Sequence, residues 1–257
     1  MPDEVLLTPY TEIGVSGILK KRLTIGVALL RNLTVDEFKA VIAHEFGHFY
    51  GKDTVVGGIL WRIGWIMERV SKFGKVWWEA FPFTNIAAVG GIIMIFYWLY
   101  RLFYSIAVLA YMRMFEYRAD FVASVVAGKE NFCNGLLNYA AFGVFFDTVC
   151  YTSIIRLLAQ RKMFVNVYEA IHNAYLKANT NKIKRMVIEK EKASIFSTHP
   201  PLRKRLARFG KAQAARRGKP AMTLFKDYRT LERGMTQILT NVIRARLAYA
   251  APAAGPA

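Results

Sequence analysis

One early segment of the chain carries apolar residues at helical spacing, namely Phe38, Val41, Ile42 and Phe49. Thr34 and Glu37 stand before this segment with the spacing of a capping box, in which each side chain bonds the other residue's backbone N–H. Gly51 is suited to the C-terminal end of a helix. The pattern predicts a helix over residues 34–51 whose apolar face must be buried.

Two short apolar runs precede this helix. Residues 11–19 and 22–29 are rich in Ile, Val and Leu and flank Lys20 and Lys21. They predict a small β element within residues 1–31. An edge strand beside the helix can bind an extended peptide through backbone hydrogen bonds, which tolerate many peptide sequences.

The strongest apolar signal lies further along the chain. Residues 83–100 carry no charge, and after Arg101 the uncharged run resumes through residues 102–112. As one helix, residues 83–100 rise about 27 Å, close to the ~30 Å hydrocarbon thickness of a bilayer. The segment predicts a long apolar helix or a helical pair, either at a membrane or as the core helix of a soluble protein.

The remaining pattern predicts one domain over residues 1–247, because no repeat or low-complexity block divides the chain. Residues 230–246 predict a last helix, and residues 248–257 a flexible Ala/Pro tail. Cys133 and Cys150 lie among apolar residues without metal or disulfide spacing, which predicts reduced core thiols in a reducing compartment. The first residues have no basic region followed by a long apolar run, so we expect no signal peptide.

Charge adds a second indication of a membrane. The chain has 257 residues and a formal net charge of +18 at pH 7. A basic helix is predicted over residues 201–219, where no acidic residue occurs and the cations are Arg203, Lys204, Arg205, Arg208, Lys211, Arg216, Arg217 and Lys219. Such a run is attracted to anionic lipid. Nucleic acid could use the same cations, but no RNP, zinc-finger or helix-turn-helix signature supports that class of partner.

The candidate chemistry is concentrated in residues 44–48, which read His-Glu-Phe-Gly-His. Two histidines four positions apart lie about 5–6 Å from each other on one helix face, so both imidazoles can bind one Zn²⁺. Glu45 sits one position round the helix, where it can take the proton of a zinc-activated water. The alternative is a chance HExxH on an ordinary surface helix. The well-marked helix around the motif favours the metal site.

A catalytic zinc needs a third protein ligand. Thr54 stands where a longer HExxHxxGxxH motif has its third histidine, so the ligand must be a carboxylate further along. Glu68 follows at an interval typical of thermolysin-like enzymes, but the arginines around it are equally typical of a solvated helix face. Glu116 has Asp120 one helical turn on, which suits a metal ligand and a carboxylate that holds a ligating imidazole. The spacing alone leaves both glutamates open.

Three motifs in order carry a family resemblance: HEFGH at residues 44–48, EYRAD at 116–120, and STHP at 197–200 with Arg205 following. Their types and order resemble the zinc metallopeptidases that include bacterial HtpX and the CAAX prenyl proteases. The motifs span residues 44–205, and the three together are far more specific than any one.

The resemblance implies roles for particular residues. It implies that His44, His48 and Glu116 bind one zinc ion and that Glu45 is the catalytic carboxylate. It implies that Asp120 contacts a metal ligand and holds it in place without binding the metal itself.

Two further histidines are less clearly assigned. His199 can donate a hydrogen bond to a tetrahedral oxyanion, or it can belong to a helix start signalled by the hydroxyls and prolines around it. The role of Arg205 stays open at this point. His172 matches no motif and is expected to be structural or exposed.

Topology constrains how the chain meets a membrane. If His48 and Glu116 meet at one ion, the chain between them can cross a bilayer only an even number of times. Two crossings need roughly 40 apolar residues, more than residues 83–112 supply. We therefore expect membrane association with an anionic surface and no full crossing, with the active site facing the cytoplasm. A cytoplasmic location is the alternative.

The resemblance implies a mainly α, zincin-like metallopeptidase domain with a small β element. A long apolar helix or helical pair is expected between the two helices that carry zinc ligands. The implied activity is zinc-dependent hydrolysis of peptide bonds, with damaged or misfolded proteins as substrates. A non-catalytic, lipid-binding adaptor with a zinc-supported fold is the rival. Glu45 argues against the adaptor, because a structural metal site has no use for a general base.

Overall fold

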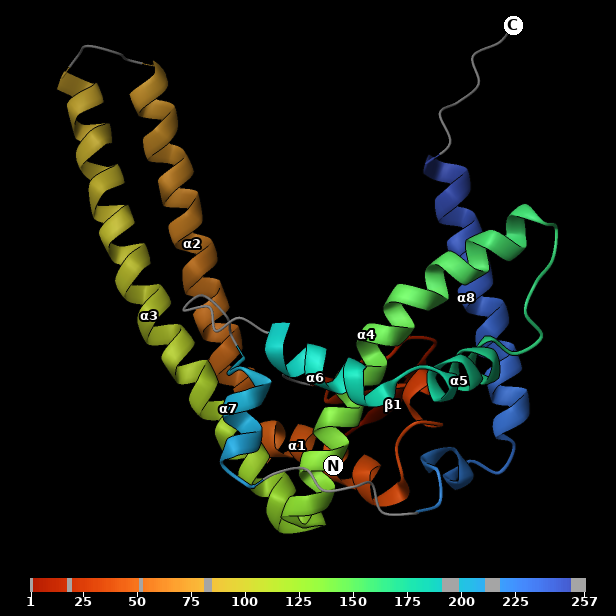
Figure 1. The fold of residues 1–257 in the computed structure, drawn as a ribbon. Helices are drawn as coiled ribbons and strands as arrows, with labels where there is room; N and C mark the ends of the chain where they lie inside the picture. The colour runs from red at the N-terminus through yellow and green to blue at the C-terminus, as the bar shows by residue number, and fades with distance from the viewer. Residues whose placement is uncertain are drawn as a thin grey trace, which may run out of the picture.

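A computed structural model of the protein describes residues 2–17, 20–50, 53–80, 85–190, 199–210 and 218–250. The molecule is mostly helical, with one small sheet near the N-terminus (Figure 1). Its described elements are β1 Glu4–Thr8, β2 Ile13–Ser16, β3 Arg22–Gly26, η1 Val27–Leu29, α1 Val35–Tyr50, α2 Asp53–Ala80, α3 Asn85–Ala127, α4 Lys129–Ala159, α5 Val167–Lys177, α6 Thr180–Lys190, α7 Leu202–Ala207, η2 Ala221–Leu224 and α8 Tyr228–Ala250.

The sheet has the strand order β1-β3-β2, with β1 parallel and β2 antiparallel to β3. Both predicted runs contain a strand, although each strand is shorter than its run. The second run leaves the sheet at Gly26, because residues 27–29 turn into η1. β1 was not predicted. It lacks the expected alternation of buried and exposed residues, since its adjacent Val5 and Leu6 are both exposed.

Helix α1 begins at the predicted capping box. The Glu37 carboxylate accepts a hydrogen bond from the Thr34 backbone N–H at 2.9 Å, and the Thr34 hydroxyl accepts one from the Glu37 N–H at 3.2 Å. The Asn138 side chain of α4 donates to the other Glu37 oxygen at 2.9 Å. The buried Glu37 therefore starts α1 and also links it to α4.

Two glycines allow α1 to lie very close to its neighbours. A Cβ atom at Gly47 would stand 2.8 Å from the Cα of Ala119 in α3, and one at Gly135 in α4 would stand 2.9 Å from the carbonyl oxygen of Glu37. Neither distance is possible for a real side chain, so only glycine permits these approaches. The crossing at Gly47 brings the HEFGH segment of α1 against the EYRAD segment of α3.

The larger of the two described hydrophobic clusters joins the sheet, η1 and the start of α1 to α4, α5 and α8. A buried polar network supports it. Glu232 of α8 accepts hydrogen bonds from Arg31 at 2.5 and 2.7 Å and from Asn166 at 2.7 Å. His172 lies next to this network with its Nδ1 2.8 Å from Asn32 Oδ1, which agrees with a structural role. Cys133 and Cys150 are free and buried, as predicted.

Helices α2 and α3 extend away from this body side by side (Figure 1). The outer part of α3 leaves many large apolar side chains exposed, including Val89, Ile92, Ile95, Phe96, Trp98, Leu99, Leu102, Phe103 and Ile106. Of the two alternatives expected for residues 83–112, the described part forms the long apolar helix, because residues 85–112 all belong to α3. The helix that packs beside it is α2, which precedes this segment. Two helical segments, Val89–Ala127 and Lys129–Ala159, are long and apolar enough to cross a membrane by length and composition.

Two helices differ in length from the sequence-based expectation. The basic helix expected over residues 201–219 is found only as the short α7, because Arg208 caps the helix and Gly210 adopts φ +108°. Residues 211–217 of that prediction lie outside the described residues. Helix α8 reaches Ala250, so residues 248–250 are helical rather than part of a tail. Two of these three residues are alanines, which favour helices more than any other residue does.

Candidate metal centre

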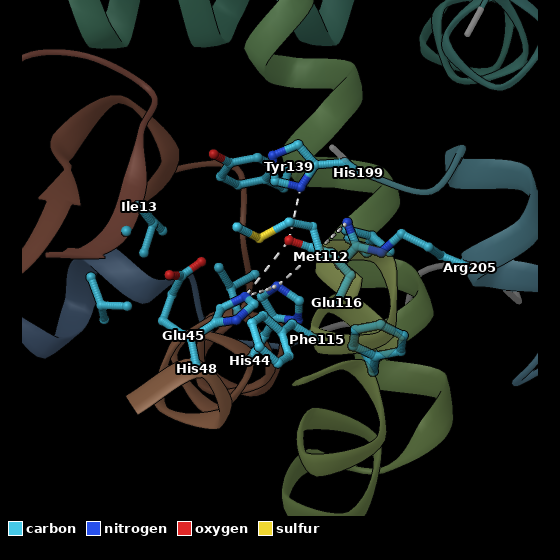
Figure 2. A pocket seen from close by; sticks show the side chains of 15 residues that line it. Ile13, His44, Glu45, His48, Met112, Phe115, Glu116, Tyr139, His199 and Arg205 are labelled. Carbon is cyan, nitrogen blue, oxygen red and sulfur yellow. Dashed lines mark hydrogen bonds and ion pairs between the residues drawn. The ribbon is translucent and has the colours of Figure 1, made fainter. Parts of the chain in front are cut away.

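The two helices bring three possible metal ligands together. His44 and His48 come from α1, and Glu116 comes from α3 (Figure 2). The two imidazole Nε2 atoms are 3.3 Å apart. A Glu116 oxygen lies 3.6 Å from His44 Nε2, and its other oxygen lies 3.8 Å from His48 Nε2. These donor atoms therefore converge on a single point.

The spacing of these atoms suits zinc. Ligand atoms held at about 2.0–2.1 Å in a tetrahedron stand about 3.3 Å from one another, close to the separations observed between the three side chains. Two imidazoles and one carboxylate are also the donor set of a catalytic zinc site, which keeps a fourth position open. The structure excludes Glu68 from this group, because its side chain is 59% exposed on α2 and pairs with Lys72 at 2.9 Å.

Asp120 lies directly behind the group and is fully buried. One of its oxygens is 3.0 Å from His44 Nδ1, which fixes the orientation of that imidazole. Arg205 of α7 binds the same carboxylate with two hydrogen bonds, from Nε at 2.9 Å and from Nη2 at 2.6 Å. Burial alone would raise the pKa of Asp120, but the hydrogen bonds with His44 and Arg205 outweigh it and lower the pKa.

Charges around Glu116 keep its carboxylate ionised. Burial would raise its pKa, but the hydrogen bond with His199 and the charge of Arg205 outweigh burial and lower it to about 2. His199 Nδ1 is 2.8 Å from one Glu116 oxygen, and Arg205 Nη1 is 3.4 Å from the other. Burial lowers the pKa of His44 despite its acidic neighbours, which favours the neutral imidazole that binds metals. An ionised Glu116 and a neutral His44 are the protonation states that bind a metal cation.

Glu45 stands beside the ligands and points toward β2 (Figure 2). Burial raises the pKa of its carboxyl to about 8, and the negative charge of Glu116 adds to this effect. The backbone N–H of Val15 donates a hydrogen bond to Glu45 and opposes the rise. A carboxyl with a pKa near neutrality can both accept and release a proton at physiological pH.

A cavity of about 620 Å³ opens onto these residues. Its walls come from β2, α1, α3, α4 and the segment with His199 and Arg205. On the β2 side, the Ile13 N–H bonds the hydroxyl of Tyr139 and the Val15 N–H bonds Glu45. Because alternate residues of a strand point their N–H groups the same way, the edge of β2 opposite β3 faces the cavity.

Arg205 and Tyr139 are the residues that sequence reasoning did not assign. Arg205 had a signal, its fixed distance after the STHP segment, but no indication of its partners. Tyr139 had none, because an aromatic residue in an apolar helix is normally a core residue. Of the two alternatives for His199, the structure places the ring against Glu116 and leaves the helix start at Pro201 without a side-chain cap. Ser197 and Thr198 lie outside the described residues.

A mostly helical domain with a small edge sheet, an HExxH helix and a glutamate from a second helix defines the class of zincin-like metallopeptidases. Comparison with known families agrees with this class. The model of peptidase family M48 matches residues 15–213, and the chain therefore belongs to this family of zinc metallopeptidases.

Two curated relatives are each named Protease HtpX homolog. The one from Pyrobaculum islandicum is 30% identical over 184 residues, which cover 66% of this chain and 50% of that protein. The one from Archaeoglobus fulgidus is 26% identical over 194 residues, which cover 72% of this chain and 54% of that protein. The chain thus spans about half the length of these relatives. No solved structure matches it significantly.

Proposed function

We propose that this chain is a zinc-dependent metalloendopeptidase. The observation that carries the proposal is the convergence of His44, His48 and Glu116 with Glu45 beside them, in one cavity lined by the outer edge of β2. His44, His48 and Glu116 would hold the zinc ion. When bound there, zinc supplies Lewis acidity, which makes water more acidic and polarises the carbonyl of the scissile bond.

The chain's own residues supply the proton transfers. Glu45 accepts a proton from the attacking water and delivers it to the leaving amine, for which its raised pKa is suited. Asp120 and Arg205 hold His44 and Glu116 in place. His199 lines the cavity with a side chain that is 66% exposed, and it would donate a hydrogen bond to the oxygen of the attacked carbonyl.

An extended peptide is the substrate that this site fits. The backbone of Ile13 and Val15 at the edge of β2 can pair with a peptide strand that displaces the Tyr139 hydroxyl and the Glu45 carboxylate from the two N–H groups. The displaced Glu45 then lies beside the bound peptide. Such pairing depends on backbone atoms, so it favours polypeptides of varied sequence over a single small molecule.

The proposed setting is protein quality control at a membrane. The HtpX-type names of the relatives and the apolar outer surface of α3 support it. Damaged or misfolded proteins, including membrane proteins, are the proposed substrates. The excess of Lys and Arg supports an active site that faces the cytoplasm and an anionic lipid surface as a partner.

The test is metal content and peptide cleavage measured on one purified sample. We expect about one zinc per chain and hydrolysis of casein or of a quenched fluorescent peptide. Glu45→Gln should keep the zinc and lose cleavage, because the amide retains the shape of the side chain but cannot accept the proton. His44→Ala should lose both.

Other results would decide against the proposal. Near-normal turnover by Glu45→Gln would remove the general base from the mechanism. Zinc binding and liposome binding without any cleavage would favour the alternative, a non-catalytic lipid-binding adaptor with a zinc-supported fold.

A further inference from the structure

A second cavity of about 500 Å³ lies between α4 and α6, next to the metal centre. Helix α4 contributes Ala140 and Val144 to its wall, and α6 contributes Ile183, Met186 and Val187. The rim is open, because Val144 is 54% and Met186 37% exposed. Apolar side chains gathered around an open cavity indicate a binding site for an apolar group.

The two cavities adjoin. Leu136, Tyr139 and Arg205 line both of them, so these side chains form the boundary between the metal centre and the second cavity. The Tyr139 hydroxyl is held by the Ile13 N–H at the edge of β2. A peptide that pairs with β2 therefore passes Tyr139 and enters the neighbourhood of the second cavity.

The charges at the second cavity disfavour an acidic ligand. Arg205 is its one charged lining residue among the described ones, and the guanidinium is already bound by Asp120 and lies 3.4 Å from Glu116. Only its aliphatic stem remains to contact a ligand. An anion that approached Arg205 would meet two buried carboxylates. The cavity thus suits an uncharged, apolar occupant.

We propose that this second cavity is a specificity pocket, which receives a large apolar side chain, such as Leu, Met or Phe, of a residue flanking the cleaved bond. The assignment rests on the proposed peptidase function. Side chains of an extended peptide alternate between two faces, so only one of the two residues beside the bond points into the pocket. The pocket would direct cleavage to apolar stretches, which folded proteins bury and misfolded proteins expose.

The test compares quenched peptides that differ only in the residues next to the cleaved bond. For the wild type we expect kcat/KM at least about tenfold higher with Leu than with Ala at one of these positions, because hydrophobic pockets discriminate by this much or more. Ala140→Leu fills the cavity and should bring the ratio close to one. Leu176→Ala, an apolar truncation at an exposed residue outside both cavities, should leave the ratio unchanged.

A second variant and a binding measurement keep the result interpretable. Met186→Ala removes part of the rim at a half-exposed position and should lower the ratio even if Ala140→Leu folds poorly. The Kd of the same peptides for the zinc-loaded Glu45→Gln variant should show the same preference without turnover. Cleavage without preference at any flanking position, or a preference that neither pocket variant changes, would overturn the pocket. Apolar preference in binding without any cleavage by the wild type would overturn only the proposed activity.

Discussion

Replacement of Asp120 by alanine tests the arrangement behind the metal ligands most directly. In the wild type this carboxylate is fully buried, lies 3.0 Å from His44 Nδ1 and accepts two hydrogen bonds from Arg205. The substitution removes both contacts at once. His44 loses the group that orients its ring, and Arg205 keeps its contact with Glu116 at 3.4 Å.

Two magnitudes follow from these contacts. Loss of a carboxylate that supports a ligating histidine lowers metal affinity by about 10–100-fold, or about 1.4–2.7 kcal/mol. A buried ion left without its partner costs about 3–5 kcal/mol. The 3.4 Å contact to Glu116 places the cost here near the lower value. A loss of about 3 kcal/mol leaves a domain of ordinary stability folded, with Tm lower by roughly 6–12 °C.

Zinc affinity can be measured by competition with a chromophoric chelator, and Tm by circular dichroism in the presence of EDTA. Glu68→Ala is the matched control, because it removes an exposed acid from α2 that pairs with Lys72 of the same helix, away from the metal ligands. It should change neither value appreciably. Glu116→Ala should lower zinc affinity sharply. An Asp120→Ala variant that binds zinc within twofold of wild type would refute the reasoning. Loss of metal in Glu68→Ala but not in Glu116→Ala would mean that Glu68, and not Glu116, is the third metal ligand.

Three further predictions concern pH, packing and the membrane. In metal-free protein the ionised Glu116 carboxylate stabilises the fold by about 3 kcal/mol above about pH 4.5, because its pKa is lowered to about 2 in the folded state. This stabilisation disappears as the pH falls toward 2. Urea unfolding at pH 6 and pH 3 should show that Glu116→Gln has lost this part of the pH dependence. Gly47→Ala should cost about 1–3 kcal/mol and weaken zinc binding, since the added methyl group pushes α1 away from Ala119; unchanged Tm and zinc affinity would contradict the close crossing. Flotation with anionic liposomes should show binding that salt and carbonate partly reverse, whereas carbonate-resistant binding with protected fragments from residues 83–112 would show that the chain spans the bilayer.

Local patterns predicted the local parts of this structure. The capping box at Thr34, the helix that follows and the shared face of His44 and His48 depend on contacts only three or four residues apart, so spacing is sufficient to find them. The choice between Glu68 and Glu116 depends on where α3 crosses α1. That crossing depends on an approach at Gly47 that spacing does not reveal.

The partners of Arg205 could not be predicted for the same reason, since Asp120 lies 85 positions earlier in the chain. The pairing of α2 with α3 was missed because the charges of α2 made it resemble a solvated helix. Those charges are largely exposed and locally paired, for example Lys72 with Glu68 and Lys75 with Glu79. This leaves the opposite side of α2 to pack on α3. The bilayer topology stays a prediction.

Glu116 lies close to the point where α3 contacts α1, so a tilt of α3 about this contact would move Glu116 very little. The contact of α3 with α1 at Ala119 is about 4.5 Å along the axis from Glu116, whereas the outer end at Asn85 is about 51 Å away. If the helix tilts about this contact as a rigid rod, a 5 Å shift of the outer end moves Glu116 by only about 0.4 Å. That displacement is within the roughly 0.5 Å that a functional site tolerates. The outer helices can therefore follow bending or thickness changes in their surroundings while the candidate metal centre keeps its geometry.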